Sequence, residues 1–141
     1  MPVDSAFDVA FAAAKPPEHF DPAALRHDLF DSTPALLNVL HTFHPWLADM
    51  RAQLRGAVDA ANAPQLAGLI HTLRGGLAQL RAKSAVDLVR QLDAVCKANP
   101  TAPLPPDHPG LLALETELEA LSAELTRFLS DVERVVPPKQ T

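Results

Sequence analysis

The chain has 141 residues, of which 48% are apolar, and a formal net charge of -5. This length predicts one domain with one hydrophobic core, and the apolar content excludes wholesale disorder. The negative charge argues against a nucleic-acid binder, and the single cysteine, Cys96, excludes an internal disulfide and a cysteine-based zinc site.

The first segment, residues 1–19, is interpreted as a leader or a linker remnant, because Pro16 and Pro17 interrupt its short helical stretch. The domain itself is predicted to span residues 20–136, followed by a tail at 137–141. It begins with a short helix over about 22–30, where Asp21 is a favourable N-cap.

Four longer helices are predicted after it, at about 34–60, 64–82, 84–99 and 109–136. Each carries apolar residues at alternating spacings of four and three, which is the pattern of a bundle seam. Ser32 or Thr33, Asn62 and Ser84 are the expected N-caps, and Pro45 should kink the first long helix. Leu88, Leu92 and Val95 are expected to face inward in the helix that begins near Ser84.

The predicted fold is therefore all-α: an antiparallel up-down-up-down four-helix bundle with a short additional N-terminal helix. The proline-rich stretch at about 99–109 is expected to be a semi-rigid surface connection. No apolar run is long enough to span a membrane and no signal-peptide pattern is visible, so a cytoplasmic domain without membrane contact is expected.

The helix at 64–82 has an unusual outer face. At about 100° per residue, its leucine seam lies opposite His71, which therefore points away from the core. The residues within roughly 60° of His71 on the helix surface have almost no side chain: Ala67, Gly68, Gly75, Ala78 and Ala82. Such a surface would let another protein approach the imidazole closely.

Arginines border this face. Arg74 lies three residues after His71, and Arg81 lies on the same edge. A cation beside an accessible imidazole suits a phosphoryl group, whose negative charge needs stabilisation. The competing interpretations are an ordinary surface histidine or a homodimer seam, and neither accounts for a histidine flanked by glycine and arginine.

The stretch "HTLRGGLAQLRA" resembles the signature of the histidine phosphotransfer (HPt) family, with His71, Leu73, Gly75, Leu80 and Ala82 in register. The upstream stretch "FDPAALRHDLFDSTPALLNVLHTF" is similar to the first half of that family's fold. The resemblance implies that His71 is phosphorylated, that Arg74 and Gln79 stabilise the phosphoryl group, and that Ala67, Gly68, Gly75, Ala78, Arg81 and Ala82 form a docking surface.

The same resemblance implies a phosphorelay intermediate of a two-component system, either free-standing or part of a hybrid sensor histidine kinase. The partners would be receiver domains, which bring Mg²⁺, so the domain would need no cofactor, metal or ATP site of its own. A monomer is expected, with no nucleic-acid partner. The alternative is a helical interaction module that docks a signalling partner without transferring phosphate.

Three residues depart from the family pattern: Arg74 replaces the usual lysine, Gln79 the usual asparagine, and Arg81 the usual glycine near the helix end. Elsewhere, His41 and His44 lie three residues apart and could form a metal site with His71. The carboxylates that such a bundle site needs are missing at matching spacing, so no metal site is predicted.

Overall fold

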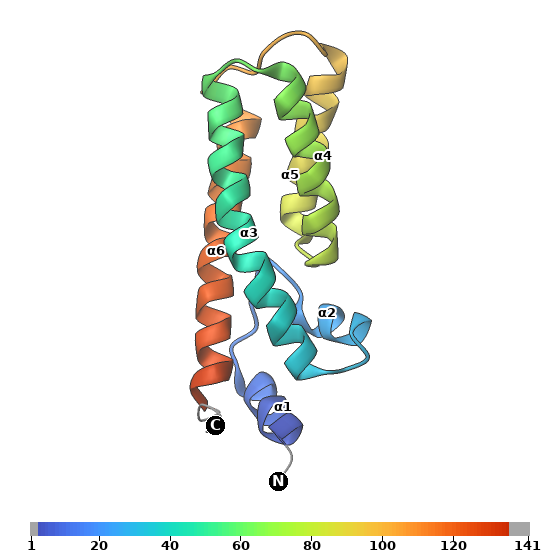
Figure 1. Ribbon diagram of the computed structural model, residues 1–141, viewed down its shortest axis with the longest axis vertical. Helices are drawn as coiled ribbons and strands as arrows, with labels where there is room; N and C mark the ends of the chain where they lie inside the picture. The colour runs from blue at the N-terminus through green and yellow to red at the C-terminus, as the bar shows by residue number, and fades with distance from the viewer. Residues whose placement is uncertain (1–2, 136–141) are drawn as a thin grey trace.

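The computed structural model describes residues 3–135, which form six helices and no strand (Figure 1). The helices are α1 (Val3–Ala13), α2 (Pro22–Asp28), α3 (Thr33–Asp59), α4 (Ala63–Gln79), α5 (Lys83–Ala98) and α6 (Pro109–Val135). The predicted all-α fold is confirmed. The predicted tail at 137–141 lies outside the described residues, and none of the described helices is long and apolar enough to cross a membrane.

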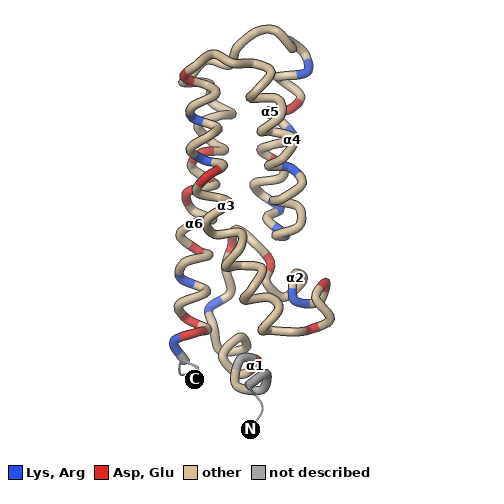
Figure 2. The backbone as a smooth tube through the Cα atoms, viewed as in Figure 1, with Lys and Arg blue, Asp and Glu red and all other residues tan. Residues whose placement is uncertain are grey.

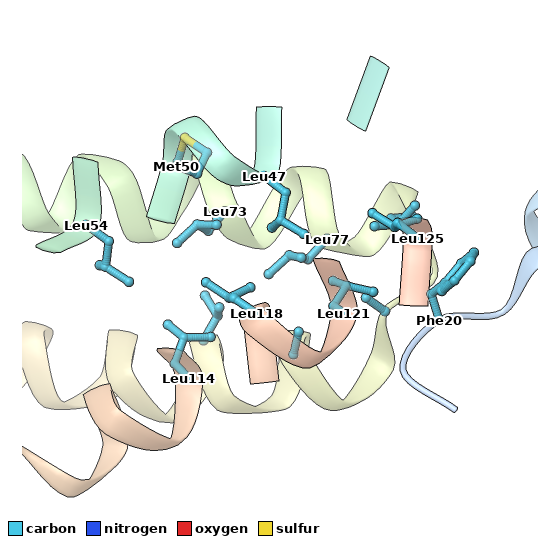
Figure 3. Close-up of a cluster of buried hydrophobic side chains, with 14 of the residues drawn as sticks. Phe20, Leu47, Met50, Leu54, Leu73, Leu77, Leu114, Leu118, Leu121 and Leu125 are labelled. Atoms are coloured by element: carbon cyan, nitrogen blue, oxygen red, sulfur yellow. The ribbon is translucent and has the colours of Figure 1, made fainter. Parts of the chain in front are cut away.

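The four longer helices form the predicted up-down-up-down bundle. Helix α3 packs against α4, α4 against α5, α5 against α6, and α6 against α3, so α4 lies diagonally across from α6. Leucines at the predicted seam positions fill the space between them (Figure 3). The seams of α4 and α6 are buried as predicted: Leu66, Ile70, Leu73, Leu77 and the C-cap residue Leu80 for the first, and Leu114, Leu118, Leu121, Leu125, Phe128 and Val132 for the second.

Helix α5 turns a different face inward than the sequence pattern predicts. Ala85, Val89 and Leu92 are buried, whereas Leu88 is half-buried and Val95 is 39% exposed. The prediction was correct for Leu92 and wrong for Val95. The helix packs against α4 on one side and α6 on the other, and the small Ala85 side chain lets its first turn lie close to them.

Side-chain caps begin three of the helices where the sequence predicts them. Asp21, Ser32 and Asn62 each accept a hydrogen bond from a backbone N–H in the first turn of α2, α3 and α4. The predicted cap at Ser84 is wrong, because α5 already begins at Lys83 and its N-cap residue has no side-chain acceptor. Helix α3 continues through Pro45, and it bends along its length in Figure 1.

The N-terminal segment completes the core beside the longer helix pair. Helices α3 and α6 have 27 residues each, whereas α4 has 17 and α5 has 16. The longer pair therefore extends about 15 Å beyond the shorter one, and α1, residues 14–21 and α2 cover this extension (Figure 1). Ala10 and Phe20 are buried, and the rings of Phe11 and Phe20 lie edge-on to Phe128 at 5.9 and 5.8 Å between centroids.

Ala10, Phe11 and Phe20 are thus part of the packed core, although the sequence pattern predicts only a leader or linker remnant before residue 20. The interpretation of 1–19 as a leader or linker remnant concerns the origin of the segment and stays a prediction. Polar contacts add to the apolar ones, since Asp8 of α1 accepts hydrogen bonds from Arg26 and Thr33.

The connection between α1 and α2 is tied to α6 by a histidine and two glutamates. The His19 Nδ1 atom lies 2.7 Å from an oxygen of Glu117, and the Glu124 carboxylate accepts the backbone N–H groups of Glu18 and His19. The hydrogen bond to Glu117 raises the pKa of His19 above its ordinary value, against the smaller opposing effect of burial. Folding therefore favours protonation of His19 relative to the unfolded chain.

This contact predicts a pH-dependent contribution to stability. Because the pKa of His19 is raised in the folded protein, its stabilisation is complete below the unfolded-state pKa of about 6.5 and is lost as pH rises through the folded-state pKa. The free energy of unfolding of wild type minus that of His19→Gln should fall between pH 6 and pH 8.5, by up to about 1 kcal/mol. Urea denaturation at several pH values measures it, and a difference that is constant or grows with pH would contradict the assignment.

Candidate functional site

Helix α4 has a buried side and an exposed side, and the candidate site lies on the exposed one. His71, Arg74, Gly75 and Ala78 are all exposed, while Leu73 and Leu77 between them have no exposed surface. The predicted outward position of His71 is therefore observed. The orientation follows from the core, because rotating the helix to bury His71 would bring its leucines into solvent.

A cavity of about 290 Å³ opens beside His71, between α4 and α5. His71 and Arg74 border it from α4, Asp93, Cys96 and Lys97 border it from α5, and the connection after α5 closes one end. Among the described residues, no side chain forms a hydrogen bond with the His71 ring, and the residue itself is exposed and borders this cavity. The imidazole is accessible to a reacting group from outside.

Three charged side chains meet at the rim of this cavity. Asp93, whose side chain is 19% exposed, lies 2.9 Å from the Lys97 ammonium and 3.9 Å from the Arg74 guanidinium. Figure 2 shows both basic and acidic positions along α5, whereas Arg74 is the charged residue of α4. Arg74 thus supplies the predicted cation next to His71, but it shares its counter-ion with a lysine from the neighbouring helix.

The glycines of α4 lie in two different environments, and only one of these requires the absence of a side chain. A Cβ atom at Gly68 or Gly75 would meet no atom within 4 Å, whereas a Cβ at Gly76 would lie 2.4 Å from the Cη2 atom of Trp46 on α3. Gly76 is therefore required for close packing between α3 and α4. Nothing within the described chain requires Gly68 or Gly75 to lack a side chain, as expected of a surface that another molecule approaches.

Other members of the predicted docking surface lie around the same face. Ala67 is exposed and borders the cavity, and Ala78 is exposed one turn beyond Gly75. Gln79 is exposed on the last residue of α4, about 12 Å along the helix axis from His71. The predicted role of Gln79 in stabilising the phosphoryl group stays a prediction.

The way α4 ends shows that the predicted place of Ala82 in the docking surface is wrong. It also shows that Arg81 has a partner within the domain. Arg81 has a left-handed backbone with φ 63°, and the N–H groups of Arg81 and Ala82 bond to the carbonyls of Ala78 and Leu77, which ends the helix. The helical projection does not extend past this turn, so Ala82 is fully buried and cannot contact a partner. The Arg81 guanidinium forms two hydrogen bonds with Asp28 of α2, at 2.9 and 2.8 Å.

The other candidate histidines are directed elsewhere. His41 lies 2.9 Å from Glu133, and His44 lies 2.8 Å from Thr126, both on α6. The structure does not bring them together with His71. Within residues 3–135 the group whose ligand atoms are close enough for a metal ion is Glu18, His19 and Glu124, where both oxygens of Glu124 already accept backbone N–H groups.

Sequence reasoning missed the contribution of α5. Asp93 and Lys97 are one helical turn apart, which is a recognisable ion-pair spacing. Nothing in the sequence connects that pair to His71, because the contact depends on how two helices pack. Cys96 borders the same cavity, and burial raises the pKa of its thiol, so the thiol form is favoured and the residue is a weak nucleophile.

Comparison with known proteins gives one family. The sequence model of the Hpt domain family matches residues 25–124. Searches of curated proteins and of solved structures found no significant match. The matched range begins within α2 and covers α3, α4, α5 and most of α6, so it includes the exposed face of α4 and the cavity beside it.

The two adjacent glycines of α4 give a direct test of their different roles. Gly76→Ala should lower the free energy of unfolding by about 1–3 kcal/mol, because the new methyl group overlaps the Trp46 ring. Gly75→Ala should raise it by about 0.5–1 kcal/mol through helix propensity. Urea denaturation measures both.

A double-variant comparison tests whether the Trp46 ring causes the loss of stability expected for Gly76→Ala. In a Trp46→Leu background, Gly76→Ala should cost much less than in wild type, because the colliding ring is gone. An equal cost in both backgrounds would show that Trp46 is not what requires the glycine.

Proposed function

The chain belongs to the Hpt domain family, whose members carry phosphoryl groups in two-component signalling, and from this premise we propose that His71 is the residue that carries it. The observation that supports this assignment is the surface around His71. An exposed imidazole with no hydrogen-bond partner among residues 3–135 lies between Gly68 and Gly75, where an added Cβ atom would meet nothing within 4 Å in that part of the chain. A receiver domain can therefore bring a phosphorylated aspartate up to the ring.

The proposed reaction is a reversible phosphoryl transfer between receiver domains. The lone pair of the His71 Nε2 atom forms a bond to phosphorus, the bond from phosphorus to the receiver's aspartate oxygen breaks, and its electron pair returns to the carboxylate. The ring retains its proton on Nδ1. In the second step, an aspartate of another receiver attacks the phosphorus and the imidazole leaves with its electron pair.

The roles of the surrounding residues follow from their positions. Arg74 lies on the same face one turn from His71 and can stabilise the phosphoryl charge. Ala67, Gly68, Gly75 and Ala78 offer a surface of small residues for docking. We propose that Mg²⁺ comes from the receiver, as in the family, and that the domain acts as a cytoplasmic monomer, either alone or within a hybrid sensor kinase.

Labelling experiments test the assignment of His71. The purified chain should gain an acid-labile, base-stable phosphoryl group when mixed with receiver domains of its source organism that have been phosphorylated with acetyl phosphate and Mg²⁺. His71→Gln should abolish the labelling, whereas His41→Gln, which removes another exposed histidine, should not. Equal labelling of His71→Gln would contradict the assignment. A receiver that binds the wild type without labelling it would support the interaction module instead.

A second prediction separates docking from chemistry. Gly75→Gln places a long side chain on the exposed face beside His71, and should lower the rate of labelling by a phosphorylated receiver at least tenfold. Phosphoramidate, a small donor that needs no docking surface, should still label His71 at close to the wild-type rate. Ala123→Gln, at an exposed position of α6 diagonally across the bundle, is the matched control and should change neither rate. If Gly75→Gln leaves receiver labelling unchanged, receivers do not dock on this face.

A further inference from the structure

Asp93 is the acidic residue that lines the cavity beside His71, and it contacts both cations there. It lies 2.9 Å from Lys97 and 3.9 Å from Arg74, and all three residues border the cavity that His71 borders. Its side chain is 19% exposed, compared with 46% for Arg74 and 73% for Lys97. The carboxylate thus lies deeper than the cations, at the junction of α4 and α5.

In this arrangement, the Arg74 guanidinium and the Lys97 ammonium can exchange their contact with Asp93 for another anion at low cost. Exposed ion pairs contribute little free energy, and the Arg74 contact of 3.9 Å is at the outer limit of an ion pair. A phosphoryl group on His71 would bring about two negative charges and three acceptor oxygens into the same space. It would compete with Asp93 for the guanidinium of Arg74 and the ammonium of Lys97.

Building on the proposed function, we propose that Asp93 is a positioning residue that competes with the phosphoryl group for Arg74 and Lys97. Lys97 is the second cation that contacts the phosphoryl group. By retaining part of the cationic charge, Asp93 keeps the phosphohistidine less stable than two free cations would make it. The phosphoryl group can then leave for the next receiver.

The size of the effect follows from charge and distance. Removing one negative charge several ångströms from a phosphoryl dianion in a largely aqueous setting corresponds to a change of about three- to tenfold in an equilibrium constant. The same screening predicts that the effect becomes smaller as ionic strength rises.

The test measures how phosphate partitions between this domain and one receiver. The receiver that labels the wild type is mixed with each variant, and the phosphorylated fraction of both proteins is measured at equilibrium. Asp93→Asn should shift the partition toward this domain by about three- to tenfold, and Lys97→Met should shift it toward the receiver. Asp93→Glu restores the charge and should return the partition close to the wild-type value. The receiver is the same throughout, so its own contribution cancels.

The control is Asp87→Asn, which makes the same charge change at an exposed position of α5 that does not border the cavity. It should leave the partition nearly unchanged. The proposal is overturned if Asp93→Asn shifts the partition toward the receiver or not at all, or if Asp87→Asn has the same effect. Lys97→Met changes a side chain that is 73% exposed, so it tests the proposal without endangering the fold.

Failure of this inference is distinguishable from failure of the proposed function. If all variants are labelled at His71 and the Asp93→Asn partition equals that of wild type, only the role of Asp93 is wrong. If the wild type is not labelled, or His71→Gln is, the proposed function is wrong and the inference falls with it.

Discussion

Burial of the leucine seam of α4 is the constraint on which the candidate site depends. Leu73 and Leu77 have no exposed surface and pack at the centre of the bundle (Figure 3). Each such side chain contributes about 1.5–3 kcal/mol when it is buried, so the rotation of α4 about its axis is strongly determined. A shift by one residue would turn the helix by about 100° and bring His71 toward the core. The exposure of the imidazole is therefore a consequence of how the opposite face packs.

The same division between two faces explains why neighbouring glycines differ. Gly76 faces α3, where the Trp46 ring occupies the space that a side chain would need, and so contributes to the close contact of the two helices. Gly75 faces outward and contributes nothing to packing. A helix with two adjacent glycines loses about 1–2 kcal/mol of propensity. The packing around Trp46 offsets this loss for Gly76, but within the described residues Gly75 has no such compensation, and the proposed docking of a receiver on this face would supply one.

Local patterns predicted the bundle, and they failed where a contact joins distant parts of the chain. The long leucine repeats of α4 and α6 allow one phase only, so their buried faces were predicted correctly. In α5, Leu88 and Val89 are adjacent and allow two phases, and packing against two neighbours selects Val89. The exposed face around His71 was predictable up to the end of α4, but the left-handed Arg81 and the buried Ala82 were not. The ion pair of Asp93 with Arg74, and the packing of Phe11 and Phe20 against Phe128, depend on contacts between distant parts of the chain, which no periodicity reveals.

The contacts at Arg74 bear on how a phosphate carrier can work in both directions. A carrier that bound its phosphoryl group with two unopposed cations would accept it readily and release it slowly, wherever those contacts stabilise the loaded state more than the transition state for transfer. The shared carboxylate of Asp93 limits this stabilisation, because both cations have a partner before the phosphoryl group arrives. Arginine in place of lysine fits such an arrangement. A planar guanidinium presents several N–H donors, so Arg74 can turn one edge toward Asp93 and another toward the phosphoryl oxygens.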